Sequence, residues 1–227
     1  MKTFAALLLS LTLLPGLVRA ANTAVPAATT TTVPFKAGVN FIPVVPAQPT
    51  AVQPGQIEVI EFFWFGCPHC FALQTYVDTW LRSKPENVVF RRIPAALNPE
   101  WDTDARAYYT AKALDIADKA YPQIFNAIHV NHMQHDSQAT YRDFFVNQFN
   151  VTAQQFDTAW NSLQVDTDLT RAKVLAQRYG VLDVPTLVVN GKWLTGPGYK
   201  LPNSQVMPAV SWLVQREEAA LANSPAE

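Results

Sequence analysis

Two cysteines three positions apart, Cys67 and Cys70, carry the most distinctive chemistry in this sequence of 227 residues. They are its only cysteines, and they stand in the stretch FFWFGCPHCFAL. Thiols at this spacing can act as a redox couple, as half of a metal site or as a structural disulfide. A disulfide between them closes a very short loop, so it would constrain the unfolded chain little. The spacing therefore favours a chemical role.

A metal site needs more ligands than these two cysteines supply. A structural zinc site usually has four ligands, and the sequence holds no second C-x-x-C motif. His129, His132 and His135 form an H-x2-H-x2-H run near a predicted helix end, but only two of the three can share a helical face. We interpret them as solvated histidines. We therefore expect no bound metal, and no cofactor other than a redox-active Cys67–Cys70 disulfide.

The sequence around the cysteines predicts two unlike thiols. A β-branched and aromatic run at 57–65 predicts a strand buried on both faces, and apolar residues at helical spacing follow the CPHC motif. Pro68 suits the first position of that helix. Cys67 then lies beside unpaired backbone N–H groups and the positive end of the helix dipole, which favour its thiolate. Cys70, one turn further, is expected to be shielded and less ionised.

His69 is expected to increase this asymmetry. An imidazole that is protonated or donates a hydrogen bond close to Cys67 stabilises the thiolate further. Each unit by which the Cys67 pKa falls below ambient pH favours the reduced form by about 1.4 kcal/mol, or about 30 mV for two electrons. A low pKa also makes Cys67 a good leaving group when a substrate thiol displaces it. The pair is therefore predicted to donate its disulfide.

The remaining pattern predicts an α/β domain with a helical block inside it. A first strand is expected at 39–45, and strands at 57–65 and 88–93 joined by a helix predict a parallel β-α-β unit. Further elements follow: helices at 101–114, 121–130, 137–149, 152–163 and 167–179, a hairpin of 186–189 and 192–194 around Asn190-Gly191, and a last helix at 204–221. Thr152 and Gln155 predict a capping box, and Gly180 a left-handed helix end.

The first 34 residues predict export. Lys2, an apolar run and the small residues Val18 and Ala20 indicate a secretory signal peptide at residues 1–20, cleaved after about Ala20. Residues 21–34, rich in Ala, Thr and Pro, predict a flexible tether. An exported protein meets conditions in which disulfides persist. The net charge of −1 gives no electrostatic reason to expect nucleic acid or an anionic membrane as a partner.

The chain contains the stretches VIEFFWFGCPHC and VPTLVVNGKW, in the order and at the spacing found in the DsbA family of thiol–disulfide oxidoreductases. The chain resembles this family over about residues 35–221. The resemblance implies a thioredoxin-like fold, with a central mixed sheet flanked by helices. This domain is expected to span residues 35–223 and to carry an inserted all-helical domain at about 97–163. It also implies a periplasmic location.

The same resemblance implies roles for residues outside the CPHC motif. Val184-Pro185 is expected to be a cis peptide facing the cysteines, with adjacent backbone that pairs with an extended substrate segment. Glu61 matches the family's buried acid, for which a role in proton transfer to Cys70 is expected. Many family members place a lysine on the neighbouring strand, but 88–93 contains none, so Arg91 or Arg92 is its possible substitute. The predicted catalytic residues are Cys67, Cys70, His69, Pro68 and Glu61, and the predicted substrate-binding residues are Val184 and Pro185.

The expected function is that of an exported dithiol oxidase. It would oxidise cysteine pairs of newly translocated, unfolded proteins through a mixed disulfide, and a quinone-linked membrane enzyme of the DsbB type would reoxidise it. The protein is expected to be a monomer and to bind no nucleic acid. A disulfide isomerase or reductase is one alternative, although 21–34 is too short for the dimerisation domain typical of exported isomerases. A non-enzymatic chaperone that binds peptides, or a metal carrier, is the other.

Overall fold

The computed structural model describes residues 35–223. The predicted signal peptide (1–20) and tether (21–34) lie outside the described residues. In the part of the chain that is described, no helix combines the length and apolar character needed to cross a membrane.

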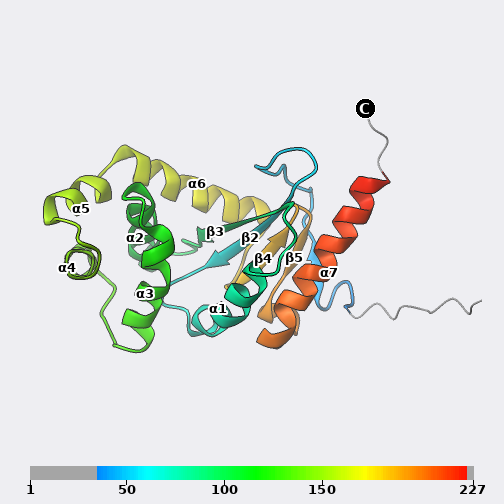
Figure 1. The fold of residues 1–227 in the computed structure, drawn as a ribbon, viewed down its shortest axis with the longest axis horizontal. Coiled ribbons are helices and arrows are strands. Elements are labelled where there is room, and N and C mark those ends of the chain that lie inside the picture. The colour runs from blue at the N-terminus through cyan, green and yellow to red at the C-terminus, as the bar shows by residue number, and fades with distance from the viewer. Residues whose placement is uncertain (1–34, 224–227) are drawn as a thin grey trace, which may run out of the picture. The chain divides into compact units, whose positions relative to one another are not determined.

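Five strands form one mixed sheet in the order β1-β5-β4-β2-β3 (Figure 1). The strands β2 and β3 run parallel, as the β-α-β pattern predicted, and the other pairings are antiparallel. Their bounds are Phe41–Pro43 (β1), Ile57–Phe63 (β2), Val88–Pro94 (β3), Thr186–Val189 (β4) and Trp193–Thr195 (β5). Because β2 lies between β4 and β3, the end of this strand and the cysteines after it lie inside the sheet and not at its edge.

Seven α-helices accompany this sheet within residues 35–223. Figure 1 shows α2 to α5 gathered beyond one end of the sheet, while α1 and α7 lie together and α6 runs from the helical group back to the sheet. The helices span Pro68–Leu81 (α1), Asp102–Ala113 (α2), Ala117–His129 (α3), Gln138–Phe149 (α4), Ala153–Trp160 (α5), Leu163–Tyr179 (α6) and Asn203–Ala222 (α7), with 3-10 turns at Pro99–Trp101 and Pro197–Tyr199. Helix α6 begins four residues before the predicted start, because the Ser162 side chain caps it by accepting the Val165 N–H.

The strand β2 is buried on both faces, as its composition predicted. Ile57 and Val59 belong to an apolar cluster that includes residues of α1 and α7. Ile60 and Phe62 point to the other face, into a cluster that includes residues of α6 and of the helical group. Because side chains alternate along the strand, its two faces pack into two separate apolar clusters. Glu61 belongs to the same strand and is therefore placed in an apolar environment.

The local turn and cap signals are confirmed. Asn190 and Gly191 both have positive φ, 51° and 68°, and connect the antiparallel strands β4 and β5. Gly180 ends α6 in the left-handed conformation. The Thr152 side chain and the Gln155 side chain form the predicted capping box of α5.

Within residues 35–223, two peptide bonds are cis. Val184-Pro185 is cis, as the family resemblance implied. Val45-Pro46 is also cis, and the sequence did not predict it, since nothing local to an X-Pro pair reveals the minority isomer.

Candidate active site around the two cysteines

The two cysteines lie where β2 passes into α1, as predicted. Cys67 is the N-cap of α1 in an extended conformation, and Pro68 occupies the first turn. The Cys70 backbone N–H donates to Cys67 Sγ at 3.3 Å, so the sulfur takes the place of a capping oxygen. The structure holds both residues as free cysteines.

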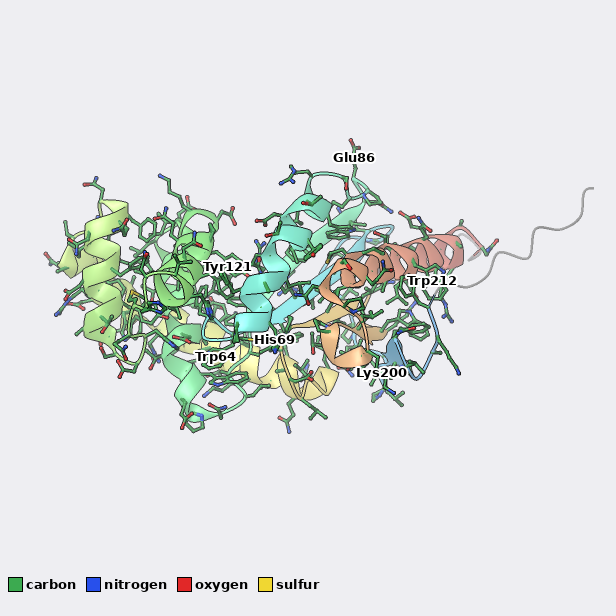
Figure 2. All side chains as sticks on the ribbon, turned by 90° about the horizontal axis from the view of Figure 1, so that it is seen from below. Trp64, His69, Glu86, Tyr121, Lys200 and Trp212 are labelled. Carbon is green, nitrogen blue, oxygen red and sulfur yellow. The ribbon has the colours of Figure 1, made fainter. Side chains whose placement is uncertain are left out.

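The Cys67 environment favours its thiolate. The pKa of Cys67 is lowered from 9.0 to about 6, with the hydrogen bond from the Cys70 thiol as the largest cause. Burial opposes this effect, while the backbone N–H groups of Cys70 and His69 lower the pKa further, and the positive charge of His69 lowers it by a smaller amount. His69 itself is exposed and lies at the N-terminal end of α1 (Figure 2). The helix end therefore contributes more than the imidazole to this shift.

Cys70 has the opposite environment. It is fully buried, and burial raises its pKa well above 9.0, assisted by its hydrogen bond and charge interaction with Cys67 and by the charge of Glu61. At neutral pH the pair accordingly holds one thiolate and one thiol. The helix junction thus gives two identical residues different chemistry, as the sequence predicted.

The cis peptide lies directly against the first sulfur. Cys67 Sγ is 3.5 Å from the carbonyl oxygen of Val184. Behind that peptide, Gly196 has a φ of 148°, and a Cβ on it would come within 2.6 Å of the Pro185 oxygen. Only a glycine can approach the backbone this closely. The segment after β5 therefore fixes the position of Val184-Pro185.

Glu61 lies in the fully buried centre of β2. Burial raises its pKa above 4.5, although Arg92 and a hydrogen bond from Gln74 act in the other direction. Arg92 Nε is 3.3 Å from Glu61 Oε2, and Gln74 Nε2 is 2.9 Å from Glu61 Oε1. Arg91 instead pairs with Glu58 at 2.5 Å. Of the two arginines that the sequence left open, Arg92 is thus the one beside the buried acid.

The sequence interpretation missed Gln74. Its Nε2 contacts both Glu61 Oε1 and, at 3.1 Å, the carbonyl oxygen of Cys70. The available signal was its spacing, because a residue four positions after Cys70 lies on the same face of α1. Gln74 therefore links the buried thiol's backbone to the buried acid.

The helical group also contacts this site. The guanidinium of Arg92 lies 4.1 Å from the ring centroid of Tyr121 on α3, and His129 Nε2 is 2.8 Å from the carbonyl oxygen of Phe65, two residues before Cys67. Trp64, interpreted from sequence as core packing, stacks on Trp101 at 4.4 Å. Helix α3 and the 3-10 turn before α2 therefore support the strand end that carries the cysteines.

The interpretation of the three histidines as solvated was wrong for two of them. His129 contacts the Phe65 carbonyl, and His135 Nδ1 lies 3.0 Å from the buried carboxylate of Asp104; only His132 is exposed. Local sequence cannot show such partners, because Phe65 and Asp104 are distant along the chain. Over residues 35–223, no group of three or more His, Cys, Asp or Glu side chains is arranged to hold a metal ion.

Comparisons with known proteins agree with this geometry. The DSBA-like thioredoxin domain family matches residues 58–206 of the chain. The thiol:disulfide interchange protein DsbA of Burkholderia cepacia is 35% identical over 198 residues, which cover 87% of this chain and 88% of that protein. The protein of the same description from Pseudomonas aeruginosa is 31% identical over 186 residues, covering 82% and 87%.

Solved structures show the same fold. The crystal structure of Pseudomonas aeruginosa DsbA superposes with a TM-score of 0.78 at 30% identity, over 83% of this chain and 97% of that one. The oxidoreductase DsbA from Xylella fastidiosa gives a TM-score of 0.72 at 27% identity, over 79% and 96%. The predicted thioredoxin-like α/β fold is confirmed.

Proposed function

Because this chain belongs to the family of DSBA-like thioredoxin domains and is a thiol:disulfide oxidoreductase, we propose that it donates the Cys67–Cys70 disulfide to cysteine pairs of other proteins. The observation that carries this direction is the site of Cys67, a helix N-cap whose pKa is lowered to about 6. A stabilised thiolate stabilises the reduced enzyme, so the disulfide is readily given away.

The first step is attack by a substrate thiolate on Cys67 Sγ of the oxidised enzyme. A substrate–Cys67 disulfide forms, the Cys67–Cys70 bond breaks, and Cys70 receives the electron pair. Because the pKa of Cys70 is raised well above 9.0, this sulfur takes up a proton. We assign the donor role to Glu61, which is buried and whose raised pKa favours its protonated form.

The second step releases the oxidised substrate. A second substrate thiolate attacks the substrate sulfur of the mixed disulfide, a new disulfide forms within the substrate, and Cys67 departs as a thiolate. Its low pKa makes it a good leaving group. The enzyme is left with two electrons more than at the start, so turnover requires an oxidant, for which we propose a quinone-linked membrane enzyme of the DsbB type.

The peptide at Val184 provides the surface on which the substrate is held. Its carbonyl lies 3.5 Å from the attacked sulfur, so a substrate segment paired with this backbone has its cysteine beside Cys67. Main-chain pairing tolerates many side chains, which suits an enzyme that acts on unfolded, newly exported proteins. We place this activity in the periplasm, following removal of residues 1–20.

Two cysteine variants test the mechanism. Cys70→Ala whose Cys67 carries a mixed disulfide with glutathione should accumulate a Cys67–substrate disulfide when given a reduced, unfolded substrate with one cysteine, because glutathione leaves as the thiol and no Cys70 thiol remains to reverse the exchange. Cys67→Ser should abolish oxidation of a reduced, unfolded substrate that has a cysteine pair. Persistent oxidation by Cys67→Ser would show that the mechanism is wrong.

Redox potential separates the oxidase from the isomerase or reductase. A potential close to that of thioredoxin, about −270 mV, would contradict the oxidase, whereas a value well above it is expected. Full function of a variant lacking both cysteines in a complementation assay would instead indicate a non-enzymatic chaperone.

A further inference from the structure

The two residues that precede the cis peptide, Leu182 and Asp183, extend from the fold beside the attacked sulfur. Leu182 is 90% exposed, although it is a large apolar residue. Asp183 is also exposed. They directly precede Val184, whose carbonyl is 3.5 Å from Cys67 Sγ. An extended segment that pairs with the backbone on the N-terminal side of Val184 therefore passes beside these two residues.

The carboxylate of Asp183 is held in a defined position. Its Oδ1 accepts a hydrogen bond of 3.2 Å from the Thr186 hydroxyl. On the other side, a Cβ on Gly198 would lie 2.7 Å from Asp183 Oδ2, so that glycine leaves room for the carboxylate. The neighbouring Tyr199 has its pKa raised, by burial first and then by the charge of Asp183. The acid is thus fixed against the segment 196–199 by the protein.

The negative charge of Asp183 lacks a cationic partner. None of the ion pairs within residues 35–223 includes it. Lys200 directly follows the segment 196–199, but no hydrogen bond or ion pair joins it to Asp183. A fixed, unpaired carboxylate next to a peptide-binding backbone complements a cation on the peptide.

We propose that Asp183 makes the enzyme prefer substrate segments that carry a lysine or arginine next to the cysteine that attacks Cys67. The inference rests on the proposed function, because it requires a substrate paired along Val184. In such pairing, side chains opposite or diagonal to each other are about 5–8 Å apart at Cβ. A lysine or arginine side chain spans this separation, so the cation reaches Asp183 while the cysteine is beside Cys67.

The test uses three reduced peptides, each with two cysteines and with Lys, Gln or Glu next to the first one. Rates of peptide oxidation by the oxidised enzyme are measured by acid quench and mass spectrometry. An exposed charge pair changes such rates by up to about fivefold, and the opposite sign acts on the Glu peptide. We expect the oxidation rates to fall in the order Lys, Gln, Glu, with a Lys-to-Glu ratio of roughly three to ten at low salt. The ratio should fall in 0.5 M salt, where the Debye length is only about 4 Å.

The matched variants are Asp183→Asn and Asp143→Asn. Asparagine keeps an oxygen that accepts the Thr186 hydroxyl, so Asp183→Asn should oxidise the Gln peptide normally while its Lys-to-Glu ratio falls to about one. Asp143 is exposed on α4, and its variant changes net charge equally, so the ratio should stay as in the unmodified enzyme. An equal ratio in all three proteins overturns the role of Asp183.

Two further outcomes keep the proposal separate from the function on which it rests. If the unmodified enzyme fails to oxidise even the Gln peptide, the proposed function fails. If it oxidises all three peptides at one rate and salt has no effect, the function stands and the charge preference is refuted. The salt series needs no variant, so it decides even if Asp183→Asn does not fold.

Discussion

Replacing His69 by serine tests whether the helix end or the imidazole controls the Cys67 thiolate. The variant keeps the backbone N–H groups of residues 69 and 70 and the Cys70 thiol, and these account for the larger causes of the lowered pKa. Only the charge of His69 is removed. We therefore expect the pKa of Cys67 to rise from about 6 by about one unit, the size of shift that one nearby charge produces, and to remain well below 9.0.

The size of the redox effect follows from these pKa values. At pH 7 a thiol with a pKa of about 6 is about 90% thiolate, while one with the ordinary value of 9.0 is about 1% thiolate. This difference stabilises the reduced enzyme by about 1.4 kcal/mol, which corresponds to about 30 mV. A rise of the pKa from about 6 to about 7 removes about 1 kcal/mol of it, so His69→Ser should lower the potential by about 20 mV.

The assay is the ultraviolet absorbance of the thiolate against pH, with reduced and oxidised protein measured in parallel. Cys67→Ser should lack the step near pH 6, which assigns it to Cys67. The glutathione equilibrium of unmodified enzyme and His69→Ser gives the two potentials. If His69→Ser titrates close to 9.0, the imidazole rather than the helix end controls the thiolate, and the reasoning from the N-cap is refuted.

Three further substitutions should affect stability or rate in defined directions. Arg92→Met removes the cation that lowers the pKa of Glu61, so at pH 7 the folded state must hold this acid either as an unpaired buried charge or with a proton that the unfolded state lacks. The free energy of unfolding at pH 7 should therefore fall by about 3 kcal/mol, and by less at pH 4, where Glu61 is mostly protonated in both states; denaturant unfolding at the two pH values measures this. His135→Gln should destabilise the protein more at pH 5.5 than at pH 9 in the same assay. The carboxylate of Asp104 raises the pKa of His135 above 6.5, so this stabilisation is complete below that unfolded value and is lost as pH rises through the folded pKa. Gly196→Ala should slow substrate oxidation and lower the midpoint of thermal unfolding, because its Cβ collides with the backbone of the cis peptide.

Controls make these outcomes specific. Gly38→Ala also introduces a side chain at positive φ, but no atom lies within 4 Å of its Cβ, so it should change stability without changing the oxidation rate. Equal loss of rate in both glycine variants would contradict the role given to Gly196. If Arg92→Met loses as much unfolding free energy, relative to the unmodified protein, at pH 4 as at pH 7, the role given to Arg92 beside Glu61 is contradicted. Equal losses for His135→Gln at both pH values would contradict the pairing of His135 with Asp104.

The local features of the site could be predicted because neighbouring residues encode them. Proline at the first helical position, a strand before it and an apolar helical face after it place Cys67 at an N-cap and Cys70 one turn inside. Similarly, Asn-Gly between two strands and Gly after a helix favour positive φ, as Asn190-Gly191 and Gly180 show. These features depend on backbone chemistry over a few residues, so the sequence alone determined them.

The features that connect distant segments required the tertiary structure. The sequence offered Arg91 and Arg92 equally, and only the strand register, which places Glu61 opposite Arg92, together with burial, brings the second guanidinium to the acid. No role was predicted for Gln74, yet packing of α1 on β2 places its amide against Glu61.

The sequence by itself determined that this protein has two unlike thiols at the start of a helix. Only the tertiary structure decided what surrounds them: the Val184 carbonyl, 117 positions along the chain from Cys67, and the His129 imidazole, 64 positions from Phe65. The physical reason is that capping and turn preferences act over a few covalent bonds, whereas these contacts form only when the whole chain has packed. The unlike pair of thiols is therefore a local property, and its surroundings belong to the fold.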